Sequence, residues 1–485
     1  MSTLSAPPRL LARPRAGPLE RSPAEPGART RGLAAIASLS LLGLTFTSLL
    51  IVVIAAQRPS FLTPVSVFDH GYFPGWMAGP FRGLWPGLTD DAVRLQWLIS
   101  ALMAGMFVLY VFAFRHAHQL RARWTIAAIV AVHAIFLLAP PLTYTDVFNY
   151  VNYGRMGVVH HLDPYATPPL LEPRSDPGYA LSNWHHLLSP YGPLFTLLTY
   201  ALVPLGVVAS FWTLKLILAL ASLATLWLVW RCAKLLGRDP AGAVAFAGLN
   251  PVVLVWGLGA DHNDGLMVAP LVLATYLLLR APPASARAGV TLAAAVFVKA
   301  SAAVLLPVLL LVGDRRRVLL GAAGAAVLLA AASVLAFGAH APGISAQSQF
   351  VTAISPPNLL GLALGQGGET GTLRACVEAA LLATLCGCSL WVLRRPGDWL
   401  AAATVAVIAL IVSLSWSGPW YLSWLAPFAA LCGRRGLRLA AVALGVYFLV
   451  AFMPAAPMLA ERIHFRPQAT ALGARHQRES EAAVR

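Results

Sequence analysis

Long apolar runs are the feature that most constrains how this chain can fold. Stretches of predominantly apolar residues recur from residue 33 to residue 455. A run of about 20 such residues is the length that an α-helix needs to cross roughly 30 Å of hydrocarbon, and a helix satisfies its backbone hydrogen bonds within the run. Composition agrees, because only 11% of the residues are charged, against roughly 25% in soluble domains. The sequence therefore predicts an all-α polytopic membrane protein.

The spacing of these runs predicts about 12–13 transmembrane helices, with interfacial helices in the outer loops. The apolar runs lie at residues 33–56, 93–114, 124–141, 193–209, 211–230, 241–258, 265–279, 288–312, 319–338, 375–393, 399–414, 420–432 and 439–455. We expect three regions along the chain. They are a disordered basic cytoplasmic tail over 1–32, a transmembrane domain over 33–460 and a polar C-terminal tail over 461–485.

The basic residues indicate membrane topology rather than nucleic-acid binding. The net charge is +16, yet the sequence has no basic stripe interleaved with aromatic residues, so no nucleic acid is expected as a partner. Arginines gather instead in the N-terminal tail and in short loops such as 115–123 and 315–317, which places these segments in the cytoplasm. The long polar loop 142–192 then lies on the outer side of the membrane.

One pair of runs disturbs this order. If 193–209 and 211–230 both crossed the membrane, Arg231, Lys234 and Arg238 would lie outside, against the positive-inside rule. We therefore favour a short or re-entrant first run at this point.

The outer loop 142–192 begins with the first candidate site. Asp146 follows an apolar run closely, so its carboxylate is expected at the outer edge of the membrane. Phe148, Tyr150 and Tyr153 recur beyond it at a spacing compatible with an interfacial helix. The alternative interpretation is a helix N-cap followed by interfacial aromatic residues.

Two tyrosines and one polar cluster form further candidates. Tyr165 and Tyr191 are each flanked by proline, which is equally typical of ordinary turns. The four consecutive polar residues Asp261-His262-Asn263-Asp264 separate two apolar runs, where they are unfavourable unless hydrated or paired. This cluster is interpreted either as a substrate or phosphate site or as a solvated loop.

Two later features add a cation and aromatic rings. Lys299 lies inside an apolar stretch, where an ammonium is a functional candidate that could neutralise a phosphate, although the side chain could also extend to the interface. Gly418-Pro419 breaks the helical pattern beside Trp420 and Tyr421. These rings could stack on a sugar or a lipid chain, or form an interfacial aromatic belt.

Metal binding is a weaker hypothesis. The outer loop contains histidines and carboxylates, which suit several divalent ions, but it lacks a spacing such as HExxH. The five cysteines form no CxxC pair. No metal or cofactor is expected. The residues in question are His160, His161, His185, His186, Asp163 and Asp176.

Together these segments resemble the polyprenol-phosphate-mannose-dependent mannosyltransferases of bacterial envelopes, which have the GT-C fold. The likeness is closest to the α-(1→6)-mannosyltransferases of lipoglycan synthesis. The segments occur in the order of that family over residues 146–424. They include Asp146 with its aromatic followers and Gly154-Arg155, Asp163-Pro164-Tyr165, Tyr191-Gly192-Pro193-Leu194, His262-Asn263-Asp264, Lys299 and Pro419-Trp420-Tyr421.

The resemblance implies a GT-C-like bundle that moves a hexose, mannose in this family, from a polyprenyl-phosphate donor to a glycan or glycolipid acceptor on the outer, periplasmic face of the plasma membrane. Asp146 is expected to be the general base, and Asp90-Asp91 is the rival acidic position. Lys299, Arg155 and His262 are expected to hold the donor phosphate. The residues expected to contact substrate are Tyr150, Tyr153, Tyr165, Tyr191, Asp261, Asn263, Asp264, Trp420 and Tyr421.

A lipid or glycan transporter or flippase is the main alternative. That class favours charged residues near helix midpoints and a repeat relating two halves of the chain. The sequence shows no clear repeat, and Lys215 and Lys299 are the exceptions among charges that otherwise lie at the ends of runs. A polymerase would carry its large outer loop late in the chain, and a purely structural protein gives no reason for the cluster at 261–264.

Overall fold

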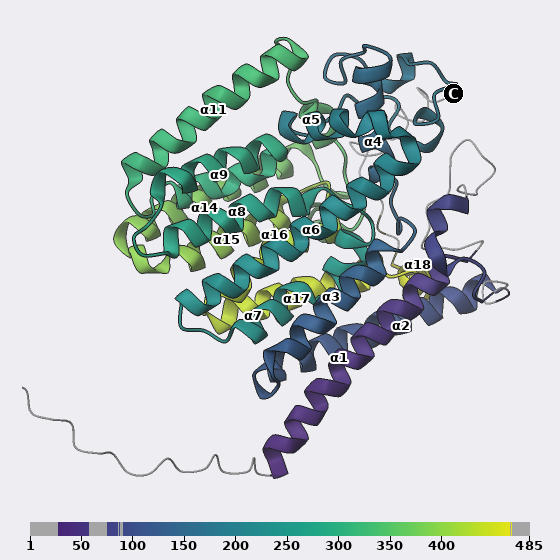
Figure 1. Ribbon diagram of the computed structural model, residues 1–485, viewed down its shortest axis with the longest axis vertical. Coiled ribbons are helices and arrows are strands. Elements are labelled where there is room, and N and C mark those ends of the chain that lie inside the picture. Colours follow the sequence, from purple (N-terminus) through teal and green to yellow (C-terminus); the bar gives the residue numbers. More distant parts are fainter. Residues whose placement is uncertain (1–27, 58–74, 86, 88–90, 466, 468–485) are drawn as a thin grey trace, which may run out of the picture.

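A computed structural model describes residues 28–57, 75–85, 87, 91–465 and 467, and this part of the chain consists of helices and connecting loops without strands (Figure 1). The prediction of an all-α fold is confirmed. Most of the predicted tails, over 1–32 and 461–485, lie outside the described residues, as does Asp90. Asp91 is described, and its carboxylate caps the N-terminus of the following helix by accepting a hydrogen bond from the Arg94 backbone N–H.

Among the described residues, the first half of the bundle contains nine α-helices. They are α1 (Ala28–Ala55), α2 (Ala92–His116), α3 (Ala122–Leu137), α4 (Asp146–Val159), α5 (Pro193–Leu202), α6 (Gly206–Leu235), α7 (Pro240–Gly248), α8 (Asp264–Leu279) and α9 (Ser285–Val298). Short helical turns connect them at η1 (Gly75–Phe81), η2 (Ala117–Gln119), η3 (Pro169–Leu171), η4 (Tyr179–Leu181), η5 (Val203–Leu205) and η6 (Val253–Leu258).

The second half continues with α10 (Leu306–Leu309), α11 (Arg315–Phe337), α12 (Ile344–Ser348), α13 (Pro356–Ala363), α14 (Gly371–Arg394), α15 (Trp399–Ser413), α16 (Leu422–Leu431), α17 (Arg435–Phe452) and α18 (Ala456–Arg462). Its short turns are η7 (Ala300–Leu305), η8 (Pro396–Asp398) and η9 (Pro419–Tyr421).

Seven helical segments among the described residues are long and apolar enough to cross a membrane. They lie at Gly32–Ala55, Val93–Gln119, Pro193–Leu235, Arg315–Phe337, Gly371–Arg394, Pro396–Ser413 and Arg435–Phe452. Shorter apolar helices, such as α3, α8 and α9, pack among them. The chain is thus a polytopic membrane protein, while the expected total of 12–13 crossings stays a prediction.

The disputed segment after residue 193 has unequal helices. α5 has ten residues and rises roughly 15 Å, about half of the hydrocarbon thickness, whereas the 30 residues of α6 are more than enough to cross. The turn between them contains Pro204, and Gly206 has a φ of 77°, which favours glycine. The short first run that the charge pattern favoured is therefore seen in the helix lengths.

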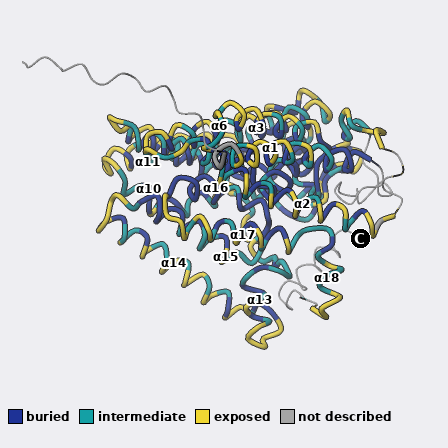
Figure 2. Tube along the Cα trace, turned by 90° about the horizontal axis from the view of Figure 1, so that it is seen from below, coloured by how far each residue is buried: buried dark blue, intermediate teal, exposed yellow. Residues whose placement is uncertain are grey.

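The bundle has a buried centre and a periphery of exposed apolar side chains. α16 packs against α6, α7, α8 and α15, and nearly all of its side chains are buried. α11 and α14 expose most of their apolar residues, including Leu335 at 89% exposure, as expected for helices that face lipid. Figure 2 shows the same contrast between the dark centre and the exposed outlying helices. Figure 1 shows α4 and α5 together at one end of the bundle, where the candidate site lies.

Candidate active site

A cavity of about 230 Å³ opens where the loop 142–192 meets the ends of the central helices. Seven residues predicted from the sequence line it: Asp146, Tyr150, Tyr191, His262, Lys299, Trp420 and Tyr421. The other lining residues are Tyr144, Thr145, Asn183, Trp184, Pro190, Gln347 and Trp416. Residues separated by more than 270 positions in the sequence thus share one cavity.

Asp146 is the first residue of α4 and its carboxylate borders the cavity. The position is favourable for a carboxylate because the N-terminus of a helix carries a partial positive charge. The Tyr191 hydroxyl donates a hydrogen bond to Oδ1 of Asp146 at 3.3 Å. Burial raises the pKa of the Asp146 carboxyl to about 6, although the nearby Lys299 ammonium lowers it. The group can therefore exchange a proton close to neutral pH.

Lys299 ends α9 and has an extended backbone between that helix and the next turn. Its ammonium donates to Oδ1 of Asp264 at 2.8 Å and to Oδ1 of Asn263 at 3.4 Å. It also lies 5.9 Å from the centre of the Tyr421 ring. The side chain contacts the polar cluster and the cavity, so the sequence alternative of an extension to the interface does not describe it.

Close backbone contacts bring these segments together. The Gly192 N–H donates to the carbonyl oxygen of Val298 at 3.0 Å, which holds Tyr191 beside Lys299. A Cβ atom at Gly192 would lie 2.1 Å from the carbonyl oxygen of Phe297, so only glycine allows this approach. The proline-flanked Tyr191-Gly192 segment is therefore more than a turn, because it joins the loop before α5 to the end of α9.

The polar cluster at 261–264 is paired with buried partners rather than hydrated as a loop. Asp261 has a φ of 58°, which is strained for a non-glycine residue. The Lys215 ammonium donates to both of its carboxylate oxygens, at 2.9 and 3.0 Å, in an ion pair buried inside the bundle. Asp264 begins α8 and also accepts a hydrogen bond from the Trp424 indole. These contacts fix both ends of the turn.

His262 lies between these two fixed ends and faces the cavity. Its ring stacks on Trp420 with centroids 4.0 Å apart and planes 16° apart, and Tyr144 packs beside both rings. Burial, reinforced by the Lys299 ammonium, lowers the pKa of the His262 imidazole well below its ordinary value. The ring is therefore neutral at physiological pH, and its buried Nε2 has no hydrogen-bond partner among the residues that the structure describes.

The structure places Arg155 outside the cavity, unlike the sequence prediction. It lies nine residues after Asp146, about 13 Å further along α4. Its guanidinium forms two hydrogen bonds of 2.8 Å with the Asp176 carboxylate, which also contacts His160 at 2.7 Å. Nine residues correspond to two and a half turns of a helix, so residues 146 and 155 lie on opposite faces of α4 and cannot both face the same small cavity. Arg155 instead anchors the loop 142–192 through Asp176.

Five other predicted residues also lie outside the cavity lining. The Tyr153 hydroxyl donates to the backbone of Leu187, and the Tyr165 hydroxyl donates to the backbone of Tyr191. Both tyrosines therefore brace the outer loop. Asp261 is paired with Lys215. Asn263 and Asp264 lie behind Lys299, which they orient.

Sequence reasoning missed the residues at the open side of the cavity, Asn183, Trp184 and Gln347. Trp184 had a usable signal, because a tryptophan in a polar outer loop is unusual. Asn183 and Gln347 had none, since amide side chains are common in loops. In the part of the chain that the structure describes, no three His, Cys, Asp or Glu side chains are grouped to hold a metal ion.

Comparisons with known proteins identify a family that this chain resembles. The profile of the "Alpha-(1->6)-mannopyranosyltransferase, N-terminal domain" matches residues 60–314, more than half of the chain. The chain is 30% identical over 166 residues to alpha-(1→6)-mannopyranosyltransferase A of Mycobacterium tuberculosis, covering 34% of this chain and 32% of that protein. It is 29% identical over 151 residues to the protein of the same name from Corynebacterium glutamicum, covering 30% of each.

The chain thus aligns with about a third of the length of these curated relatives. No solved structure matches it. The matched range contains Asp146, Tyr191, the 261–264 cluster and Lys299, whereas Gln347 and the tryptophans at 416 and 420 lie beyond it. On the profile match over residues 60–314, the chain belongs to the alpha-(1→6)-mannopyranosyltransferase family.

Proposed function

We propose that this protein is a membrane glycosyltransferase. It transfers a hexose, mannose in view of its family, from a polyprenyl-phosphate donor to a hydroxyl of a glycan or glycolipid acceptor on the outer face of the bacterial plasma membrane. The acceptor oxygen bonds to the anomeric carbon while the bond from that carbon to the phosphate oxygen breaks. The acceptor proton is taken up by the protein, and the electron pair leaves with the polyprenyl phosphate.

Asp146 accepts the proton in this proposal. A general base works best when its pKa lies near the operating pH, and burial brings the pKa of this carboxyl to about 6. Tyr191 holds one carboxylate oxygen by a hydrogen bond at 3.3 Å, which leaves the other to face an acceptor hydroxyl. One carboxylate suffices, because the leaving group is already a phosphate and needs no proton.

Lys299 and His262 hold the donor phosphate. The Lys299 ammonium is the cation of the cavity lining, and it can turn from Asp264 toward a phosphate because it has three N–H donors. His262 contributes a hydrogen bond as a neutral ring rather than a charge. Charge-assisted hydrogen bonds to phosphate oxygens stabilise the negative charge that develops as the bond breaks.

The buried aromatic residues that line the cavity contact the transferred sugar. Trp420 and Tyr421 are buried beside His262 and line the cavity, and Tyr150 fixes the turn by accepting a hydrogen bond from the Asn263 N–H at 3.3 Å. Sites of this kind combine aromatic surfaces with a few placed polar groups. Asp264 acts through Lys299, whose direction it sets.

The convergence of Asp146, Lys299 and His262 on one cavity is the single observation that carries the proposal. The test uses the purified full-length protein in detergent or nanodiscs, supplied with a radiolabelled polyprenyl-phosphate mannose and an α-(1→6)-linked mannoside, with no nucleotide sugar. Transfer of label to the mannoside supports the proposal. Absence of transfer by folded protein, or transfer only from a nucleotide sugar, contradicts it. Net movement of intact donor across a vesicle membrane would instead favour the flippase.

A further inference from the structure

The cavity has two chemically different ends. The floor is buried and carries the ionisable groups, with His262, Trp420 and Tyr421 all less than a tenth exposed. The open end, which we name the mouth, consists of Asn183, Trp184, Gln347 and Trp416. None of the four mouth residues is ionisable, and each is at least partly exposed.

We infer that the mouth is the subsite for the acceptor saccharide, an inference that rests on the proposed transferase function. Trp184 and Trp416 offer aromatic faces on which the C–H face of a sugar ring can stack, with ring centroids 5.9 Å apart and planes at 83°. The amides of Asn183 and Gln347 supply both donors and acceptors for hydroxyl groups. An uncharged saccharide fits this end, whereas the phosphate-bearing donor fits the charged floor.

The mouth is assembled from three segments that are distant in the sequence, at residues 183–184, at Gln347 on α12 and at Trp416. Asn149, one turn after Asp146 on α4, accepts hydrogen bonds from the backbone N–H groups of Asn183 and Trp184 at 3.0 and 3.1 Å. This contact ties one side of the mouth to the helix that carries the proposed base. Phe350 packs edge-on against Trp184 and at a tilt of 52° against Trp416, which completes the aromatic cluster.

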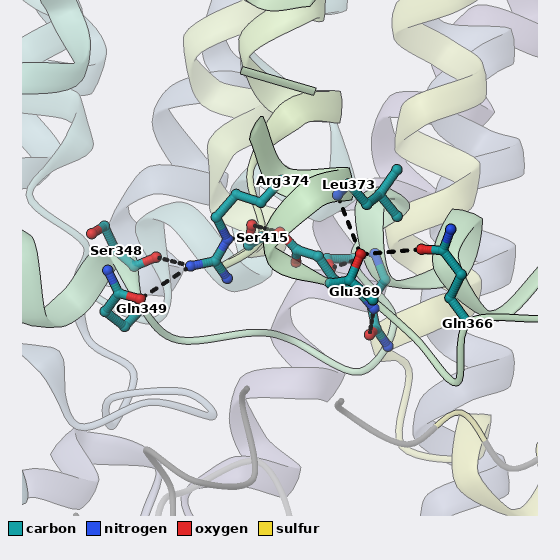
Figure 3. A network of polar contacts seen from close by, with 10 residues as sticks. Ser348, Gln349, Gln366, Glu369, Leu373, Arg374 and Ser415 are labelled. Atoms are coloured by element: carbon teal, nitrogen blue, oxygen red, sulfur yellow. Dashed lines mark hydrogen bonds and ion pairs between the residues drawn. The ribbon is translucent and has the colours of Figure 1, made fainter. Parts of the chain in front are cut away.

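A buried ion pair holds the opposite side. Arg374 and Glu369 are joined at 2.8 Å, with side chains 14% and 0% exposed. Arg374 donates to the Ser348 carbonyl oxygen at 3.2 Å and to the Gln349 side chain at 3.4 Å, directly after Gln347. Glu369 accepts a hydrogen bond of 2.6 Å from the Ser415 hydroxyl, directly before Trp416. Figure 3 shows Arg374 pointing toward Ser348 and Gln349, with Ser415 and Glu369 close to its other side.

The pair therefore acts as a positioning device for the mouth. Burying an ion pair gains little stability on balance, because desolvation offsets the attraction. This pair also leaves Oε2 of Glu369 and Nη2 of Arg374 buried without hydrogen-bond partners in the described part of the chain. Its clear structural effect is to fix Gln347 and Trp416 relative to each other. Both residues lie beyond the matched range 60–314, whereas Asn183 and Trp184 lie inside it, so the mouth combines residues from two parts of the chain.

The test separates the acceptor from the donor in full-length protein. Trp416→Ala should raise the acceptor KM for an α-(1→6)-linked mannobiose glycoside about tenfold, the loss of one aromatic contact, while the donor KM stays unchanged. Gln347→Ala, which removes a partly exposed side chain, should raise the acceptor KM severalfold. Glu369→Gln should raise it as well, and Trp416→Phe, which keeps a ring, should stay close to wild type.

Trp124→Ala serves as the matched control, because Trp124 is 55% exposed at the far end of α3. Saturation-transfer NMR of mannobiose with donor-free protein provides a second measurement that needs no catalysis. An acceptor KM unchanged in both Trp416→Ala and Gln347→Ala, or a raised donor KM instead, overturns the inference. Mannobiose binding by wild-type protein that transfers no sugar would contradict the proposed function while leaving the subsite intact.

Discussion

Two lysine–aspartate pairs meet at the same four-residue turn, and they differ in access to the cavity. Lys215 and Asp261 are joined at 2.9 Å with side chains only 1% and 3% exposed. Lys299 and Asp264 are joined at 2.8 Å, but Lys299 is 19% exposed and lines the cavity. The sealed pair can only hold the turn in place. The open pair can exchange its internal partner for a ligand.

Within one motif, the buried pair thus has a structural role and the accessible pair is available for chemistry. Asp261 needs its strained backbone and its buried partner so that His262 faces the cavity and Asp264 contacts Lys299. Asp264 in turn directs Lys299 toward the space beside Asp146. A lysine in an apolar run is thus informative only when its partner and its exposure are known.

Removing the sealed lysine should have the largest effect on stability. Lys215→Met leaves the Asp261 charge buried without a partner, which should lower the free energy of unfolding by about 3–5 kcal/mol. Reversible unfolding in mixed micelles measures this loss. The double variant Lys215→Met/Asp261→Asn should recover most of it, because no lone charge remains. A single variant as stable as wild type would mean that the pair does not hold the turn.

Removing the open lysine should act mainly on activity. Lys299→Met should lower the transfer rate by on the order of 10²–10³, the usual effect of losing one preorganised charge-stabilising group. Its stability loss should be smaller than that of Lys215→Met, because the Trp424 indole still donates to Asp264 and the cavity admits water. The control is Lys234→Met, which changes the third lysine of the chain at an exposed position. Equal stability losses in the Lys215 and Lys299 variants would erase the proposed distinction.

The contact that opens Lys299 to the cavity should be sensitive to one methyl group. Gly192→Ala places a Cβ 2.1 Å from the Phe297 carbonyl oxygen, so the Tyr191 segment must move away from the end of α9. Overpacking of this kind should lower the free energy of unfolding by about 1–3 kcal/mol and reduce transfer. Gly387→Ala, in open space on α14, should be neutral or slightly stabilising. Wild-type activity in Gly192→Ala would show that the contact is dispensable.

The pH profile should report the coupling between the open pair and the base. Asp146 must be deprotonated to accept a proton, so kcat/KM should fall about tenfold per unit below a pH of about 6. The Lys299 ammonium lowers the pKa of this carboxyl, so Lys299→Met should move the acidic limb to higher pH. Measuring the residual kcat/KM of that variant across pH 5–8 checks the direction. An acidic limb at the same pH in both proteins would mean either that Asp146 does not cause the limb or that Lys299 does not influence the pKa of Asp146.

Much of the architecture could be predicted from the sequence, because membrane spans require long apolar runs whatever their neighbours are. The break at Lys299 and the short run after residue 193 could also be predicted, because each one interrupts the pattern of long apolar runs. Pairing between distant residues was not. Lys215 and Asp261 are 46 residues apart, and nothing local shows that they meet.

Residues of the candidate site could be predicted where a charged side chain stands among apolar residues. A carboxylate at Asp146 and an ammonium at Lys299 stand out against apolar neighbours. Arg155 stands out equally, yet it pairs with Asp176 because its position along α4 turns it away from the cavity. Gln347 gave no signal, since its role depends on the position of α12, which Arg374 and Glu369 help to fix.

The most direct test of the account is the transfer rate of Asp146→Asn, measured with labelled polyprenyl-phosphate mannose and purified full-length protein. The amide preserves the size of the side chain but removes the base. We predict a loss of transfer on the order of 10²–10⁴, with unchanged donor binding and a similar unfolding midpoint. Full transfer activity in Asp146→Asn would contradict the assignment of this cavity as the centre of the reaction.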